Sequence, residues 1–169
     1  MPTVVADSGP LRYLVLIGEI AILPRIVGDV LIPPAVQSEL DRPRTPEPVR
    51  AWIAAPPSWV RIGPAPAVTD PQLMPLDAGE QAVIALALQT GAGTVLMDDR
   101  AGVMAALAKG LAVIGTIGVL DRAARHGLVD LAAAFARLRA TNFRYPPALL
   151  DAVLAEDRVR SARLTGGDE

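Results

Sequence analysis

The sequence predicts an α/β fold in which a central parallel sheet is flanked by helices on both faces. Short apolar runs that read as strands alternate along the chain with longer segments of helical periodicity. The strand-like runs are apolar at successive positions, as expected for strands that are buried on both faces. Glycine and proline residues mark many of the boundaries between these segments, so the segments can be told apart along the chain.

The boundaries of the elements follow from local signals. Pro10 fits the first turn of a helix after the opening strand, Pro33 and Pro34 open another helix, and Gly91 ends a third. The predicted strands are 3–6, 30–32, 59–62, 94–97 and 111–114. The predicted helices are 10–17, 20–27, 33–40, 49–54, 77–90, 101–108, 117–125, 131–139 and 147–158.

The bulk composition indicates one compact domain over residues 1–158, followed by a polar C-terminal tail over 159–169. The chain has 169 residues, of which 51 % are apolar, so it can bury a sizeable core. The net charge of −2 gives no global attraction to nucleic acid. Binding of that kind would need a local basic patch or metal ions.

The chain contains no cysteine, which excludes disulfides, cysteine nucleophiles and thiolate zinc sites, and which fits a cytoplasmic protein. The first residues lack the features of a signal peptide. The apolar stretch 102–120 is long enough to span a bilayer, but Lys109 and Gly110 divide it into shorter elements. No membrane association is therefore expected.

Three acidic residues follow predicted strands. Asp7 comes directly after the first strand, and Asp98 and Asp99 come directly after the strand 94–97. Ligands in parallel α/β sheets bind beyond the carboxyl ends of the strands, so these carboxylates are expected to share one crevice. An aspartate after a strand is equally often the cap of the next helix, and that alternative stays open for each residue taken singly.

Two glutamates lie on the apolar faces of predicted helices. Glu80 heads the apolar stripe of the helix 77–90, and Glu39 shares the face of Ala35 and Val36. A carboxylate on a core-facing stripe is costly unless something compensates it. The alternative for Glu80 is a capping box with Asp77, and the alternative for Glu39 is a solvated helix end.

The coincidence of these five acids points to a divalent cation. Gathered carboxylates repel one another and raise one another's pKa, and a cation relieves this repulsion. Oxygen ligands without histidine or cysteine suit Mg²⁺ or Mn²⁺. The expected metal ligands are Asp7, Glu80, Asp98 and Asp99, with Glu39 as a further catalytic acid, and which of Asp98 and Asp99 binds the metal stays open.

These residues make the sequence resemble a PIN domain over about residues 3–158. The segments that carry the resemblance are V-V-A-D-S-G-P-L (4–11), I-P-P-A-V-Q-S-E-L (32–40), L-D-A-G-E-Q-A-V-I-A-L-A (76–87), V-L-M-D-D-R (95–100) and G-L-A-V-I-G-T-I-G-V-L (110–120). The chain is most similar to a bacterial and archaeal branch of predicted nucleic-acid-binding PIN proteins. Better-known relatives of that branch are VapC-type toxins, metal-dependent endoribonucleases that an antitoxin restrains.

The resemblance implies a Mg²⁺- or Mn²⁺-dependent ribonuclease, and possible roles as the toxin of a toxin–antitoxin pair with a small antitoxin as partner. Two departures stand out: the third acid is Glu80 where the toxins carry Asp, and their closing T-x-D pattern is absent. Asp98 stands where Thr is expected and Arg100 where the last Asp would fall, so Arg100 is expected to bind phosphate or to neutralise Asp98. The alternative function is a catalytically weak PIN scaffold that binds nucleic acid or a protein.

Other residues were weighed for binding roles. Five arginines could form a basic rim for RNA phosphates or a solvated surface: Arg122, Arg125, Arg137, Arg139 and Arg144. Trp52 and Trp59 are expected to pack rather than to stack on bases. Five apolar residues exceed what one core needs and predict a homodimer or antitoxin interface: Leu11, Leu14, Ile17, Ile20 and Ile22.

Overall fold

The structure is a computed structural model that describes residues 3–166. The chain forms two compact units, residues 1–116 and residues 117–169. The first unit contains the sheet and all five acids that the sequence singles out. The prediction of a single domain over 1–158 remains a prediction.

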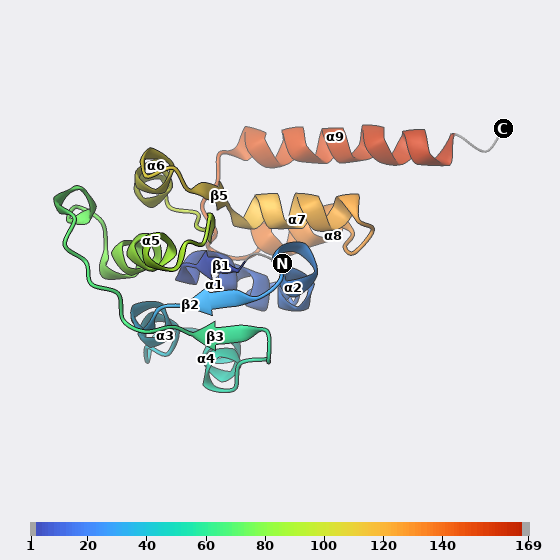
Figure 1. The fold of residues 1–169 in the computed structure, drawn as a ribbon. Coiled ribbons are helices and arrows are strands. Elements are labelled where there is room, and N and C mark those ends of the chain that lie inside the picture. The colour runs from blue at the N-terminus through green and yellow to red at the C-terminus, as the bar shows by residue number, and fades with distance from the viewer. Residues whose placement is uncertain (1–2, 167–169) are drawn as a thin grey trace. The chain divides into compact units, whose positions relative to one another are not determined.

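The first unit is built on a five-stranded parallel sheet in the order β3-β2-β1-β4-β5 (Figure 1). The strands are β1 (Val4–Ala6), β2 (Val30–Ile32), β3 (Val60–Ile62), β4 (Thr94–Leu96) and β5 (Ala112–Ile114). The chain runs from β1 outward to β3, then returns to place β4 and β5 on the other side of β1. The strand order therefore reverses between β1 and β4, the point at which such sheets bind ligands.

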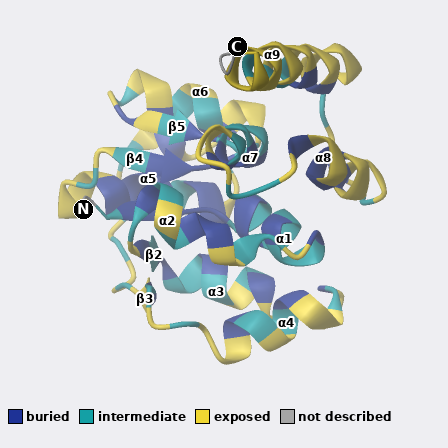
Figure 2. Ribbon diagram, turned by 90° about the vertical axis from the view of Figure 1, so that its right-hand side faces the viewer, coloured by how far each residue is buried: buried dark blue, intermediate teal, exposed yellow. Residues whose placement is uncertain are grey.

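Helices pack on both faces of this sheet (Figures 1 and 2). They are α1 (Ser8–Leu16), α2 (Leu23–Val27), α3 (Pro34–Leu40), α4 (Glu47–Ala54), α5 (Ala78–Thr90) and α6 (Arg100–Ala108), with short 3-10 turns at Ile20–Ile22 and Pro71–Leu73. All three residues of β1 are buried although their side chains alternate between the faces, so both faces are covered. The predicted fold class is confirmed.

The apolar residues of α1 and the turn after it belong to the core. Leu11 and Leu14 are fully buried, Ile17 and Ile22 nearly so, and Ile20 is half-buried. The sequence-based interpretation of these side chains as a surplus patch fails, because the chain itself covers them. The prediction of a homodimer or antitoxin interface loses this support.

The long loop between β3 and α5 is fastened to the end of α6. Lys109, the only lysine of the chain, donates a hydrogen bond to Gln72 Oε1 (2.7 Å) and forms an ion pair with Asp70. The bond from the Lys109 ammonium, and after it the hydrogen bond from Gln72 N, hold the pKa of Asp70 below its usual range. Lys109 therefore anchors the loop a few residues before α5 begins.

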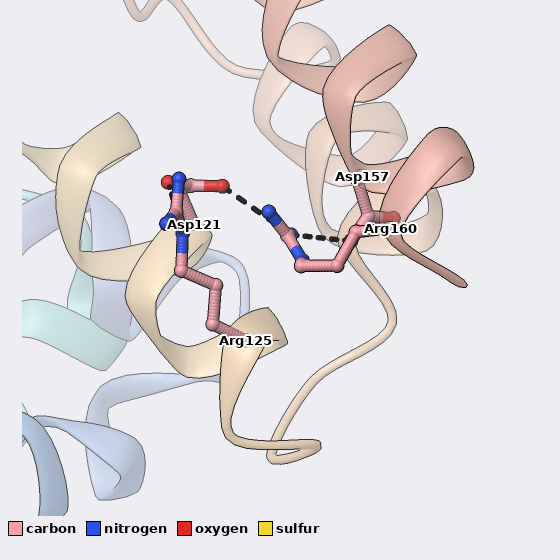
Figure 3. Close-up of polar contacts among 4 residues, drawn as sticks. All are labelled: Asp121, Arg125, Asp157 and Arg160. Carbon is pink, nitrogen blue, oxygen red and sulfur yellow. Dashed lines mark hydrogen bonds and ion pairs between the residues drawn. The ribbon is translucent and has the colours of Figure 1, made fainter. Parts of the chain in front are cut away.

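The second unit holds most of α7 (Thr116–Arg125), together with α8 (Leu131–Arg139) and α9 (Pro147–Thr165). α8 packs against α9, and Arg139 pairs with Asp151 across the two helices at 3.0 Å. Arg160 of α9 lies between Asp157 (2.8 Å) and Asp121 of α7 (3.6 Å), as Figure 3 shows. These ion pairs join the helices within this unit.

The predicted end of the last helix at Arg158 needs correction, because α9 continues through Thr165 and so includes the first residues of the predicted tail 159–169. No glycine or proline interrupts residues 148–165, and the stretch after Arg158 is rich in arginine, alanine and leucine, which favour helices. Polar composition alone was a poor guide, since a solvated helix is also polar. Residues 167–169 of the predicted tail lie outside the described residues.

None of the helices found between residues 3 and 166 has the length and apolar character required to cross a membrane.

Replacement of Leu14 by Ala tests the placement of α1 in the core. We expect Leu14→Ala to lower the free energy of unfolding by about 2–5 kcal/mol, because it leaves a cavity at a fully buried position. Leu88→Ala, at a leucine of α5 that is 46 % exposed, serves as the control and should change stability by less than about 0.5 kcal/mol. Urea denaturation measures both variants. Equal stabilities for the two would contradict the placement.

Candidate active site

Asp7 occupies the junction between the central strand and the first helix. Its backbone N–H donates to Leu96 O of β4 (2.9 Å), which fixes it beside the end of that strand. Its carboxylate oxygen Oδ1 accepts a hydrogen bond from Ser8 N (2.9 Å) and so caps α1. The residue is only 7 % exposed. Asp7 is therefore both a helix cap and a buried carboxylate at the switch point of the sheet.

Asp98 and Asp99 follow β4 on the same edge of the sheet and differ in their surroundings. The Asp98 carboxylate accepts hydrogen bonds from Thr116 N (2.7 Å) and Thr116 Oγ1 (2.6 Å). Asp99 is exposed and caps α6 by accepting from Ala101 N (3.2 Å). Within residues 3–166 Asp98 forms no ion pair with Arg100, so Thr116 rather than Arg100 satisfies it.

Glu80 is held at the start of α5 by a reciprocal pair of hydrogen bonds. Glu80 N donates to Asp77 Oδ1 (2.8 Å), and Asp77 N donates to Glu80 Oε2 (3.3 Å). Glu80 is nonetheless only 5 % exposed, and its Cγ and Cδ atoms lie close to Gly102 of α6. Glu80 is therefore a partner in the capping box and a buried carboxylate at the same time, while its role as a metal ligand stays a prediction.

Glu39 approaches the same region from the last turn of α3, which packs against α5. A Cβ atom built on Gly79 would stand 2.8 Å from Glu39 Oε2 and 3.4 Å from Asp7 Oδ1. Oxygens of both carboxylates therefore lie close to Gly79 in the first turn of α5. Glu39 is half-exposed, so it forms part of the solvent side of the cluster.

Burial and mutual repulsion raise the pKa of the acids at the centre. The pKa of Asp7 is raised to about 7, mainly by burial. The hydrogen bond from Ser8 N lowers this pKa, and the charges of Glu39, Asp77 and Asp98 raise it. Burial, then the charges of Asp77 and Asp99, raise the pKa of Glu80 to about 8 against the bond from Asp77 N–H. Burial likewise raises the pKa of Asp98, while its bonds from Thr116 lower it.

The structure gathers all five predicted acids and adds two residues that the sequence analysis did not assign to the site. Asp77 was interpreted only as a cap, although it lies one helical turn before Glu80. Thr116 directly follows β5 and Gly115 at the same carboxyl edge of the sheet, but it is not an acid. Polar residues after every strand of the sheet would have been the signal for Thr116.

The residues weighed for nucleic-acid contact lie elsewhere or have partners. Trp52 and Trp59 pack on each other with ring centroids 6.1 Å apart, and Trp59 precedes β3, at the edge of the sheet opposite the acids. Arg125 pairs with Asp121 at 3.1 Å, and Arg139 pairs with Asp151. These two arginines are neutralised by neighbouring acids, which weakens the predicted basic rim.

The donor chemistry of the cluster fits a hard divalent cation. Every side chain in it offers oxygen, and the pKa values of Asp7 and Glu80 are raised first by burial and then by the neighbouring carboxylates. Over the described part of the chain, no group of three or more histidine, cysteine, aspartate or glutamate residues is arranged as a complete metal site. A cation would therefore have to draw the carboxylates closer or bind them through water.

The sequence model of a family described as a PIN domain matches residues 3–158. The chain belongs to the PIN-domain family. The match spans the sheet, the acidic cluster and most of α9, and PIN domains are generally nucleases. No curated protein and no solved structure matches the chain.

The raised pKa values predict how the stability of the metal-free protein depends on pH. Asp7 and Glu80 titrate near 7 and 8 in the folded chain and near 3.8 and 4.5 when unfolded. Between these limits the folded state binds more protons at Asp7 and Glu80, so the contribution of these two acids to stability falls as pH rises to about 8. Urea denaturation in chelator from pH 5 to 8.5 should show this fall.

Asp7→Asn should make the fall with pH shallower, because the neutral amide carries no proton to lose. Asp130→Asn, at an exposed cap of α8, is the control and should leave the pH dependence unchanged. A slope in Asp7→Asn equal to that of the wild-type protein would show that Asp7 is not a strained carboxylate.

Proposed function

We propose that this chain is a metal-dependent endoribonuclease that hydrolyses RNA phosphodiester bonds at its acidic site. The carrying observation is the burial of Asp7 at the switch point of the sheet, where the charges of Glu39, Asp77 and Asp98 act on it. A fold gains no stability from gathering like charges there, so a cation-dependent function is the physical reason for the arrangement. Membership of the PIN-domain family supports cleavage of nucleic acid.

In the proposed reaction a water oxygen forms a bond to phosphorus, and the bond from phosphorus to one ester oxygen of the RNA breaks. A carboxylate of the cluster accepts a proton from the water, and the departing oxygen takes up a proton. Asp7 and Glu80, fixed by caps on two helices, are the rigid acids of the site. Asp99 and Glu39 stand on its solvent side, where a water or a phosphate arrives.

Mg²⁺ or Mn²⁺ is the proposed cofactor, held by Asp7, Glu80, Asp98 and Asp99 with Glu39 as an additional acid. When bound, such a cation acidifies a water and stabilises the charge that develops on the phosphate. The carboxylates supply only oxygen, which these two ions prefer.

The resemblance to VapC-type proteins is the basis for three further parts of the proposal. These are RNA as the substrate, a role as the toxin of a toxin–antitoxin pair, and a small antitoxin or a second copy of the chain as the partner. The apolar residues of α1 no longer favour an interface, because they are buried. The site itself supports phosphodiester hydrolysis independently of these partners.

Replacement of Asp7 by Asn should abolish metal-dependent RNA cleavage while the fold remains intact. The variant removes a buried charge from a repulsive cluster, and Asn caps a helix as well as Asp does. A gel assay on labelled RNA with Mn²⁺ measures cleavage, and circular dichroism measures the fold. Asp130→Asn is the control and should cut at the wild-type rate.

Undiminished cleavage by Asp7→Asn would refute the site assignment. RNA binding by the wild-type protein that persists in chelator, with no cleavage under any metal condition, would favour the scaffold alternative.

A divalent cation should raise the melting temperature of the wild-type protein. At a hundred times its dissociation constant, a cation that binds only the folded state adds about 2.7 kcal/mol. Each kcal/mol is worth roughly 2–4 °C for a chain of this size, so a rise of about 5–10 °C is expected. Mn²⁺ should act at lower concentration than Mg²⁺, because it tolerates imperfect geometry better.

Glu80→Gln should reduce this metal-induced rise, since Gln can still accept the hydrogen bond from Asp77 N–H but lacks the charge. Differential scanning fluorimetry with and without Mn²⁺ measures the effect. If Glu80 were only a partner in the capping box, the two proteins would show the same rise.

A further inference from the structure

The loop that follows Glu39 carries two arginines whose charges no acid neutralises. This loop, residues 41–46, joins α3 to α4 and contains Arg42 and Arg44, both exposed. Among residues 3–166 neither guanidinium group forms an ion pair, although Glu39 lies only three residues before Arg42. Two positive charges are therefore available to a ligand beside an acid of the candidate site.

The backbone of this loop is held against the last turn of α3. Thr45 is buried, and its Oγ1 donates a hydrogen bond to Glu39 O (3.2 Å) while its N–H donates to Arg42 O (2.9 Å). Pro43 and Pro46 restrict their own backbone and that of the residues before them. The loop is therefore fixed relative to Glu39, and a ligand that binds its arginines does not have to order the backbone first.

A third arginine stands on the other side of Asp7. Arg100 is the first residue of α6, directly after Asp99, and it is exposed and forms no ion pair within residues 3–166. α3 follows β2 and α6 follows β4, and these two strands are the neighbours of β1, after which Asp7 stands. Neighbouring strands lie only about 4.7–4.9 Å apart. Unpaired arginines therefore follow the strands on both sides of Asp7.

This distribution of charge suits a chain of phosphates that crosses the acidic cluster. The carboxylates of the cluster repel a nucleic-acid backbone, and the net charge of −2 gives no attraction over a longer distance. Arginines on both sides of the cluster supply that attraction locally. A guanidinium group can also donate two parallel hydrogen bonds to one phosphate, which holds the phosphate in a defined orientation.

We propose that Arg42, Arg44 and Arg100 bind the phosphate backbone of RNA on the two sides of the acidic site. The inference rests on the proposed function for its substrate, because it places the bond to be hydrolysed between the two groups of arginines. Arg42 and Arg44 bind phosphates on the Glu39 side, and Arg100 binds a phosphate on the Asp99 side. Contacts to phosphate carry no information about the bases, so these arginines position the strand without selecting its sequence.

The test removes the positive charges one at a time. Arg42→Gln, Arg44→Gln and Arg100→Gln alter exposed side chains, so their melting temperatures should stay near that of the wild-type protein. Fluorescence anisotropy with a labelled single-stranded RNA, in the presence of chelator, measures the affinity from about 50 to 200 mM salt. Each variant should bind more weakly, and the slope of log affinity against log salt concentration should become shallower by about 0.7 for each lost phosphate contact. The triple variant should lose about 2 from the slope.

Arg25→Gln is the matched control. Arg25 is also exposed and forms no ion pair within the described residues, but it lies on α2, which leads into the amino end of β2. It therefore lies at the edge of the sheet opposite the acids, and its replacement makes the same change in charge without changing the affinity or the slope. DNA of the same sequence is the second probe, because it shares the phosphates. An arginine effect on DNA alone would assign the surface to DNA and overturn RNA as its ligand.

The outcomes separate this inference from the proposed function. A wild-type protein that binds no RNA at low salt, or affinities and slopes that are equal in the wild-type protein and the three variants, would overturn the phosphate-binding role alone. Equal losses in Arg25→Gln would overturn it too, because only net charge would then matter. Polyglutamate that displaces the RNA at an equal concentration of charge would assign the arginines to an acidic polypeptide. Arginine-dependent binding by a protein that cuts no RNA with any metal supports the phosphate-binding role and overturns the proposed nuclease.

Discussion

The burial of Asp7 among other carboxylates is the constraint on which the arrangement of this chain depends. Asp7 ends the central strand, and its backbone N–H reaches Leu96 O across to β4. Placing Asp7 there brings it beside Asp98, while α3 and α5 bring Glu39 and Glu80. Every element that packs at this edge of the sheet must therefore accommodate negative charge.

The N-termini of helices accommodate much of this negative charge. Asp7, Asp77 and Asp99 cap α1, α5 and α6, and Asp98 accepts from the N–H of Thr116, where α7 begins. The N–H groups at the start of a helix carry partial positive charge, worth typically 0.3–1 kcal/mol to a nearby anion. Burial still outweighs them, because the pKa of Asp7 and of Glu80 remains raised. The helix starts thus position the carboxylates without compensating the cost of their burial.

The sequence predicted those features of the acidic cluster that follow from the position of a residue on a single strand or a single helix. Asp7, Asp98 and Asp99 could be placed together because the carboxyl ends of parallel strands share an edge. The strand order could not be read, since pairing between distant segments leaves no local pattern. Asp77 was not assigned to the site because its role as a helix cap already accounted for it. The leucines of α1 were interpreted as an interface because the number of apolar residues does not reveal whether the chain's own core buries them. The end of α9 was misplaced because polar residues suit a solvated helix as well as a tail.

The pair Asp98–Asp99 shows how the structure accommodates the departure from the toxin pattern. The threonine expected at the position of Asp98 is absent there, but Thr116 brings a hydroxyl to Asp98 Oδ2 from the neighbouring strand end at 2.6 Å. Both Asp98 oxygens accept from Thr116, so Asp98 is bound into the start of α7. Asp99 accepts a single backbone hydrogen bond, is exposed, and acts by its charge on Glu80. The two neighbours therefore differ in role: Asp98 is fixed beside Asp7 by Thr116, and Asp99 is the solvent-exposed carboxylate of the pair.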